Sequence, residues 1–183
     1  MNSVDFHDVN LDRLQWVADR LHESFPRHVV IGLRGTLGAG KTRLVQCLAV
    51  AAGIDVADVT SPTFTIVQHY CGKRRIHHID AYRLADEDEF AELGGDELIE
   101  DDDAWVLIEW PQRIAGCLPA DALMIEIELT TSAASHGTAN HLSTSLADAA
   151  TTDAGLRLIR FHCPNDRFFR LLSDIKATYK PLS

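Results

Sequence analysis

Residues 35–42 read GTLGAGKT and combine three glycines with a lysine and a threonine. The spacing matches G-x-x-x-x-G-K-[ST], the Walker A pattern, in which glycines let successive backbone N–H groups face an anion. The helix that follows such a loop adds the positive end of its dipole to the same site. Lys41 is expected to reach the β and γ phosphates of a nucleotide, and Thr42 to bind Mg²⁺ through its hydroxyl. The sequence therefore predicts a phosphate-binding loop.

Two carboxylates are candidates for the rest of the chemistry. Hydrolysis of a bound nucleotide needs an acid that orients Mg²⁺ and a group that positions water. Asp80 ends the run IHHID and Glu109 ends the run WVLIE. The second run is the more apolar, because histidines interrupt the first. The residues do not decide which acid is the principal metal ligand, and a solvent-facing carboxylate at a strand end is the plainer alternative for each.

The hydrophobic pattern predicts the elements that position these residues. Residues 28–34 indicate a buried strand directly before the glycines, and residues 41–52 a helix directly after them. Residues 63–70 and 75–80 favour a hairpin, which implies a sheet that is not wholly parallel. Further elements are expected as helices at 11–25 and 165–177, strands at 105–109, 124–129 and 156–161, and short helical turns in the acidic region after residue 85.

Composition indicates an ordinary globular chain. Its 183 residues suit one domain, with 46% hydrophobic and 24% charged residues. No apolar run approaches the roughly 20 residues that span a bilayer, and the first ten residues lack an export signal. We therefore expect a soluble, cytoplasmic protein without a membrane partner. Residues 130–155 are rich in Ala, Ser and Thr and predict a flexible insertion.

The charge of the chain is concentrated in one place. The net charge is −10, and residues 86–103 hold eleven acidic side chains and no basic one. An acidic balance disfavours direct, tight binding to nucleic-acid phosphates, which needs clustered Lys and Arg. The acidic stretch is either a solvated face or a docking surface for a basic partner. The four cysteines form no metal or redox motif, and His77 and His78 should point to opposite faces of a strand.

Five motifs follow one another along the chain: GTLGAGKT, SPTF at 61–64, HIDAYRL at 78–84, EFAELG at 89–94 and LIEWP at 107–111. This series resembles the TsaE (YjeE) family, small bacterial ATPases of the tRNA threonylcarbamoyladenosine pathway. The resemblance covers about residues 11–129. It implies an α/β fold, a P-loop NTPase-like three-layer sandwich with a mixed central sheet flanked by helices. On this basis residues 1–183 are expected to be a single P-loop ATPase domain.

The resemblance also implies activity and partners. It implies an ATP hydrolase, weak alone, that binds ATP with Mg²⁺ and resets the TsaB–TsaD complex between turnovers, meeting tRNA only indirectly. It assigns Asp80 as the Walker B-like acid and Glu109 as the catalytic or water-positioning acid. The implied catalytic residues are Lys41, Asp80 and Glu109, and the metal ligands are Thr42, Asp80 and Glu109. The implied nucleotide-binding residues are Gly35, Thr36, Leu37, Gly38, Ala39, Gly40, Lys41, Thr42, Ser61, Thr63 and Trp110.

Two other functions share the P-loop. A nucleotide-gated binding module would use ATP only to order a switch, with negligible hydrolysis. A small-molecule kinase would need cationic side chains on a lid, yet no Lys or Arg occurs between Arg113 and Arg157. The kinase is therefore the weaker alternative.

Overall fold

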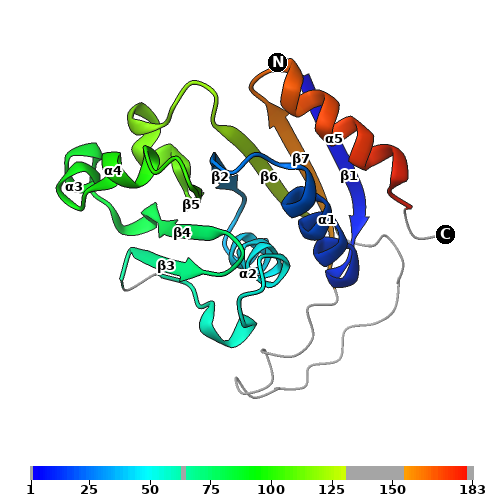
Figure 1. Ribbon diagram of the computed structural model, residues 1–183, viewed down its shortest axis with the longest axis horizontal. Helices are drawn as coiled ribbons and strands as arrows, with labels where there is room; N and C mark the ends of the chain where they lie inside the picture. The colour runs from blue at the N-terminus through cyan, green and yellow to red at the C-terminus, as the bar shows by residue number, and fades with distance from the viewer. Residues whose placement is uncertain (1, 63–64, 131–154, 181–183) are drawn as a thin grey trace, which may run out of the picture.

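The computed structural model describes residues 2–62, 65–130 and 155–180, and its elements are labelled in Figure 1. The strands are β1 (Asn2–Val9), β2 (Val29–Arg34), β3 (Val67–Cys71), β4 (Arg75–Asp80), β5 (Ala104–Glu109), β6 (Leu123–Thr130) and β7 (Leu156–Cys163). The α-helices are α1 (Leu11–Ser24), α2 (Lys41–Ala51), α3 (Glu87–Glu92), α4 (Gly95–Ile99) and α5 (Asp166–Thr178). Short 3₁₀ segments cover Val56–Asp58, Ala81–Arg83 and Pro111–Cys117.

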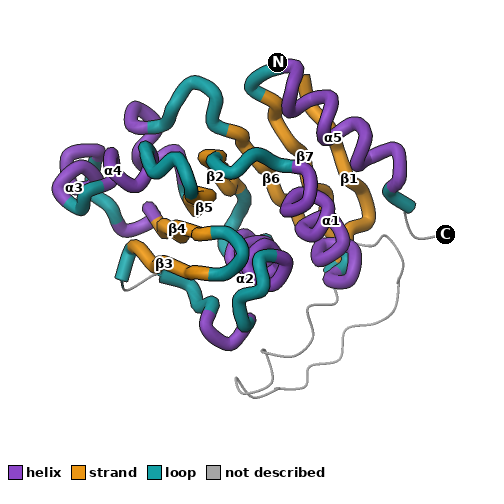
Figure 2. The backbone as a smooth tube through the Cα atoms, in the orientation of Figure 1, coloured by secondary structure: helices purple, strands orange, loops and turns teal. Residues whose placement is uncertain are grey.

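The described strands form one mixed sheet in the order β1-β7-β6-β2-β5-β4-β3. The four strands β6, β2, β5 and β4 run parallel in the middle. Antiparallel pairing adds β7 and β1 at one edge and β3 at the other. Figure 2 shows α3 and α4 near the β3–β4 edge, and α5 against β1 and β7. Because the parallel strands are covered on both faces, β2 and β5 are nearly continuous apolar runs.

Each face of the sheet has its own apolar core, because side chains alternate along a strand. In β5, Trp105 and Leu107 pack with α1, α2 and α5, whereas Val106 and Ile108 pack with the α3–α4 region. Full burial of a side chain of this size stabilises the fold by about 1.5–3 kcal/mol. The same alternation directs Glu109, the next residue of β5, toward the α2 face. The two cores with the sheet between them give three layers.

The predicted fold class is confirmed, and most predicted elements lie within two residues of the observed ones. Asparagine caps define two helix starts: Asn10 accepts a hydrogen bond from Arg13 N, and Asn165 accepts one from Phe168 N. The acidic region forms the two short helices α3 and α4, as expected.

Two expectations about strands need correction. No element is predicted for β1, although Val4 and Phe6 alternate with polar residues there and are buried. The strand expected at 63–70 begins only at Val67, because the Pro62 carbonyl accepts hydrogen bonds from the backbone N–H of Thr65 and of Ile66, forming a turn. The predicted flexible insertion at 130–155 lies almost wholly outside the described residues.

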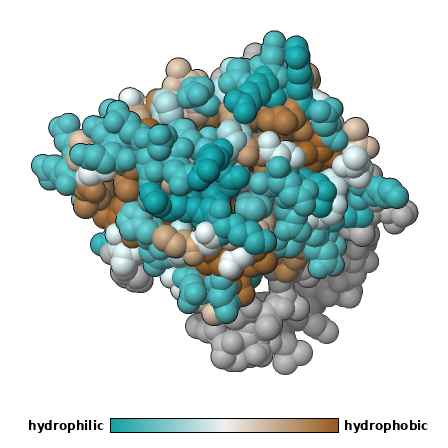
Figure 3. Space-filling view, viewed as in Figure 1, coloured by the Kyte–Doolittle hydropathy of each residue, from teal (hydrophilic) through white to brown (hydrophobic). Residues whose placement is uncertain are grey.

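The face drawn in Figure 3 is predominantly hydrophilic, with apolar side chains showing between polar ones. Within the described ranges, none of the helices combines the length and apolar character needed to cross a membrane.

Candidate functional site

The candidate site lies where the parallel strands end. The loop of residues 35–42 leaves the carboxyl end of β2, Asp80 ends β4 and Glu109 ends β5. Asp80 and Glu109 are register partners on neighbouring parallel strands, so the two acids lie side by side. The carboxyl edge of an open α/β sheet is the usual place for a ligand crevice. Strand direction therefore brings together three segments that are far apart in the sequence.

The glycine loop is shaped by positive backbone φ angles. Gly35, Gly38 and Gly40 have φ values of 148°, 81° and 106°, a range that side-chain-bearing residues rarely adopt. A Cβ at Gly35 would lie 2.5 Å from the Ile127 carbonyl oxygen, whereas one at Gly38 would have no described atom within 4 Å. Gly40 caps α2 without a side-chain hydrogen bond to the first N–H groups of the helix. Those N–H groups are therefore available to an anion.

Lys41 is held over the loop. Its Nζ donates hydrogen bonds to the carbonyls of Gly35 at 3.0 Å and Thr36 at 2.9 Å. The same ammonium lies 4.0 Å from the centre of the Trp110 ring, a cation–π contact. Burial lowers the pKa of Lys41, while the charges of Glu109 and Asp80 oppose that change. The lysine is thus positioned between the loop and the two acids.

Glu109 connects the loop to the sheet. Its Oε1 accepts a hydrogen bond of 2.6 Å from Thr42 Oγ1 and one of 2.9 Å from His78 Nε2. Glu109 is only 4% exposed and His78 is fully buried. The sequence predicts no role for His78, since a histidine in an apolar run carries no local signal of a partner 31 residues away.

Asp80 is nearly as buried as Glu109, at 5% exposure, and its Oδ1 accepts a hydrogen bond of 3.1 Å from Tyr82 N. The charge of Asp80 opposes the lowering of the Lys41 pKa. Glu109 is the acid that accepts a hydrogen bond from the Thr42 hydroxyl. The geometry therefore brings both acids to the loop, where either could be the principal ligand of a metal ion.

Trp110 follows Glu109 in a strained conformation. Its φ of 59° is in the left-handed region, which a bulky side chain rarely adopts. Residues in such strained conformations cluster at functional sites. The turn places the indole over Lys41 and against Tyr82, whose ring centre is 5.1 Å away. Ser61 is exposed next to the start of the gap in the description, and Thr63 lies outside the described residues. Their expected part in sensing phosphate stays a prediction.

Arg157 is a site residue that the sequence analysis missed. It belongs to β7, is 1% exposed, and donates from Nε to the Ala39 carbonyl of the loop at 3.1 Å. Its guanidinium also fills the space beside Gly40, where a Cβ would lie 2.8 Å from Nε. No local pattern could identify this contact, because 118 residues separate the two partners.

The two histidines before Asp80 do point to opposite faces of β4. His77 Nδ1 lies 2.8 Å from His69 Nδ1, and His77 Nε2 lies 2.9 Å from Asp101 Oδ2, whereas His78 contacts Glu109. The expectation drawn from strand alternation is confirmed.

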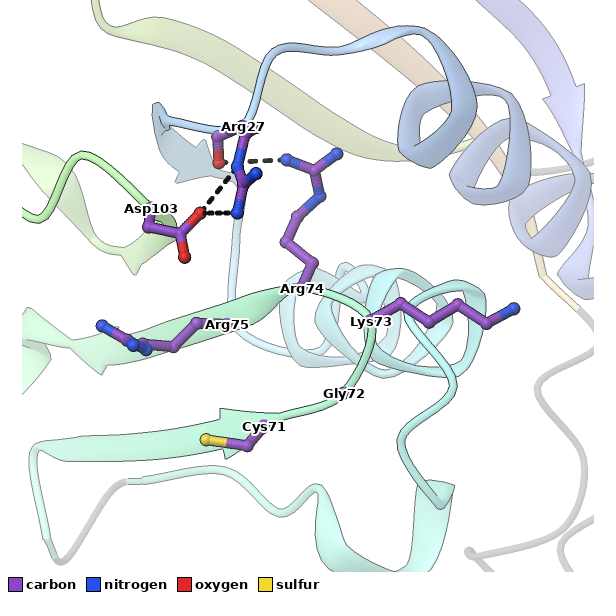
Figure 4. Close-up of a pocket in the computed structure, with 7 residues that line it drawn as sticks. All are labelled: Arg27, Cys71, Gly72, Lys73, Arg74, Arg75 and Asp103. Carbon is purple, nitrogen blue, oxygen red and sulfur yellow. Dashed lines mark hydrogen bonds and ion pairs between the residues drawn. The ribbon is translucent and has the colours of Figure 1, made fainter.

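A cavity of about 450 Å³ beside the β3–β4 turn gathers basic side chains away from the glycine loop (Figure 4). Arg27 Nε donates to Asp103 Oδ1 at 2.7 Å, and Arg75 pairs with Asp101 at 2.7 Å. Arg74 donates to the Pro26 carbonyl at 2.7 Å. The end of the acidic stretch is therefore partly engaged in ion pairs within the fold.

The fold and the site define a class of protein. A glycine loop between a buried parallel strand and a helix, on a mixed sheet with helices on both faces, is a P-loop NTPase-like fold. The crystal structure of Bacillus subtilus YdiB has this fold, with a TM-score of 0.68 and 24% sequence identity over 96% of this chain and 95% of that one.

Sequence comparison identifies the family. Residues 9–137 match the family described as Threonylcarbamoyl adenosine biosynthesis protein TsaE. Two similar proteins carry the name tRNA threonylcarbamoyladenosine biosynthesis protein TsaE. The one from Treponema pallidum (strain Nichols) is 39% identical over 100 residues, which cover 55% of this chain and 73% of the relative. The one from Bacillus subtilis (strain 168) is 41% identical over 130 residues, covering 70% and 79%. The chain belongs to the TsaE family, a family of tRNA threonylcarbamoyladenosine biosynthesis.

Proposed function

We propose that the chain is an ATPase that binds ATP with Mg²⁺ and acts with the TsaB–TsaD complex. In this proposal the complex attaches a threonylcarbamoyl group to the adenosine beside the anticodon of tRNA, and ATP hydrolysis resets it between turnovers. The observation that carries the proposal is the hydrogen bond from Thr42 to Glu109 beside the glycine loop, with Asp80 on the next strand. A reaction on tRNA also supports a cytoplasmic location.

The donor set fits Mg²⁺ that arrives with a nucleotide. Mg²⁺ is usually held by one or two carboxylates together with substrate phosphates, not by a complete protein cage. In the described part of the chain no three His, Cys, Asp or Glu side chains gather as a metal site. Thr42, Asp80 and Glu109 offer hard oxygen donors at the loop and would hold the ion with the phosphates. Bound Mg²⁺ would supply neutralisation of phosphate charge.

The side chains of the site have distinct tasks in this reaction. The first N–H groups of α2 bind phosphate oxygens, and Lys41 exchanges its loop carbonyls for the β and γ phosphates. Glu109 orients the attacking water and accepts its proton, as a buried carboxylate at the loop can do. Water attacks the γ-phosphorus and the bond to the β–γ bridging oxygen breaks, which yields ADP and inorganic phosphate.

Exposed apolar side chains beside the loop support the need for partners. Leu37, within the loop, is 88% exposed, and Tyr82, against Trp110, is 52% exposed. A partner bound at the candidate site would contact both of these side chains. A partner that covers them would exclude water and strengthen the electrostatics of the site. Weak hydrolysis by the chain alone follows from this.

Phosphate release tests the proposed activity. Release of phosphate from ATP is measured for the chain alone and with TsaB and TsaD added. We expect slow release alone, faster release with the partners, and none from Lys41→Ala. Activity that persists in Lys41→Ala would overturn the assignment of the loop.

A pull-down tests the partnership. Capture of TsaB and TsaD by the chain is compared in ATP and in ADP, and we expect stronger capture in ATP. ATP-dependent capture without any phosphate release would instead indicate the nucleotide-gated binding module.

The assay of ATP turnover also tests the kinase alternative. Phosphate that appears on a nucleoside or sugar, in place of free phosphate, would indicate a kinase.

A further inference from the structure

A line of polar side chains, buried at its centre, runs from the glycine loop into the sheet. It starts at the Thr42 hydroxyl, passes through the Glu109 carboxylate and reaches His78 Nε2. On the other side of the imidazole ring, the Tyr70 hydroxyl lies 3.4 Å from His78 Nδ1. The same hydroxyl contacts the Gln68 side chain and the Thr60 carbonyl. The His78 ring therefore links the Glu109 carboxylate to the Tyr70 hydroxyl.

Hydrogen-bond chemistry fixes the roles in this line. An ionised carboxylate only accepts hydrogen bonds, so both Thr42 and His78 must donate to Glu109 Oε1. Nε2 of His78 therefore carries a hydrogen. Burial, reinforced by the charge of Glu109, raises the pKa of Tyr70 to about 12, so its hydroxyl is neutral. That hydroxyl donates to the Thr60 carbonyl and to Gln68, and its oxygen lies 3.4 Å from His78 Nδ1. A group at one ring nitrogen sets the orientation of the other, as it does for catalytic histidines in general.

The two donors to Glu109 differ in what else they must do. Thr42 lies at the start of α2 and is the hydroxyl proposed to turn toward Mg²⁺. His78 is fully buried in a central strand and has no second task at the loop. We propose that His78 is a positioning residue that holds the Glu109 carboxylate in place when the Thr42 hydroxyl is engaged by the nucleotide and its metal. This inference rests on the proposed ATPase function and deepens it.

The neighbouring histidine provides a matched control. His77 has the same side chain, lies in the same strand and is 5% exposed. It faces the other side of the sheet, where it contacts His69 and Asp101. A loss of general strand packing should follow substitution of either histidine, but a loss of Glu109 orientation should follow only substitution of His78.

The kinetic test uses amides of two lengths. The glutamine amide nitrogen reaches the place of imidazole Nε2, whereas the asparagine amide reaches only that of Nδ1. Phosphate release is measured with TsaB and TsaD present. Removal of a side chain that holds a metal-ligating residue in place typically costs 10–100-fold in activity. We expect kcat to fall about 10–100-fold in His78→Asn with KM changed less than about twofold, substantial recovery in His78→Gln, and little change in His77→Asn. Equal kcat in wild type and His78→Asn would overturn the inference.

A spectroscopic test does not depend on hydrolysis. Long-range ¹H–¹⁵N spectra of the nucleotide-free chain report which imidazole nitrogen carries hydrogen, and a His78→Gln difference spectrum assigns the His78 signal. We expect a protonated, slowly exchanging Nε2 in wild type, and faster exchange of that hydrogen in Glu109→Ala. An unprotonated Nε2, or exchange unaffected by Glu109→Ala, would contradict the inference even if His78→Asn did not fold. A wild type that releases no phosphate would refute the proposed function, while these spectra would still decide whether His78 holds Glu109.

Discussion

Replacement of Gly35 by alanine should destabilise the protein far more than replacement of Gly38 in the same loop. Both glycines have positive φ, at 148° and 81°. Their surroundings differ: a Cβ at Gly35 would lie 2.5 Å from the Ile127 carbonyl oxygen and 3.1 Å from the Ala39 Cβ, whereas one at Gly38 would have no described atom within 4 Å. Only Gly35 therefore combines a positive φ with a steric conflict.

The magnitude follows from these two contributions. A side-chain-bearing residue in a sparsely populated region of positive φ costs about 1–3 kcal/mol, and both variants carry this cost. A methyl group forced against backbone adds about 1–3 kcal/mol by overpacking, and only Gly35→Ala has it. We expect the free energy of unfolding of Gly35→Ala to lie about 1–3 kcal/mol below that of Gly38→Ala. For a chain of this length, 1 kcal/mol corresponds to about 2–4 °C in Tm.

Urea unfolding followed by circular dichroism measures the difference, and calorimetry with ATP and Mg²⁺ measures binding in the same two variants. Gly38→Ala should keep most of its stability but bind ATP more weakly, because its methyl group enters the open side of the loop. Equal loss of stability in the two variants would show that the contact with Ile127 does not constrain the loop. Full ATP affinity in Gly38→Ala would show that phosphate does not approach there.

Three further predictions concern residues at the loop and, in one case, an ion pair on the opposite face of the sheet. Arg157→Lys removes the buried donor to a loop carbonyl, so its free energy of unfolding should fall by about 1–3 kcal/mol and ATP binding should weaken; unchanged urea unfolding would refute the contact. The hydrogen bond from His77, as the largest cause, and that from Arg75, as the next, hold the pKa of Asp101 well below its usual range. Because the pKa is lower in the folded state, this stabilisation is present above about pH 4 and is lost as the pH falls, so the stability advantage of wild type over Asp101→Asn should shrink from pH 7 to pH 3; a constant advantage would contradict it. Asp80→Ala and Glu109→Ala should each suppress phosphate release, with ATP binding retained better in Glu109→Ala; equal release by Glu109→Ala and wild type would refute its catalytic role.

The sequence predicts the loop and its flanking elements well because their signals are local. Glycine spacing, a buried apolar strand and the helix that begins at Lys41 all fall within about 25 contiguous residues. Asp80 and Glu109 were also predictable, since each is a carboxylate that ends an apolar strand. Their side-by-side placement needed the strand order, which no short segment encodes.

The remaining features depend on pairing between distant segments. His78 of β4 contacts Glu109 of the neighbouring strand β5, and Arg157 contacts the loop from β7. Strand alternation predicted that the two adjacent histidines would diverge, but not which of them would face the acid. The left-handed turn at Trp110 is fixed by packing against Lys41 and Tyr82, because tryptophan has no local preference for positive φ.

Calorimetric titration of the purified chain with ATP in the presence of Mg²⁺ tests whether residues 35–42 form a nucleotide-binding loop. We expect saturable heat at one site per chain, with affinity weakened at least tenfold in Lys41→Ala. The absence of heat from adenine nucleotides, both for the chain alone and with TsaB and TsaD present, would contradict it.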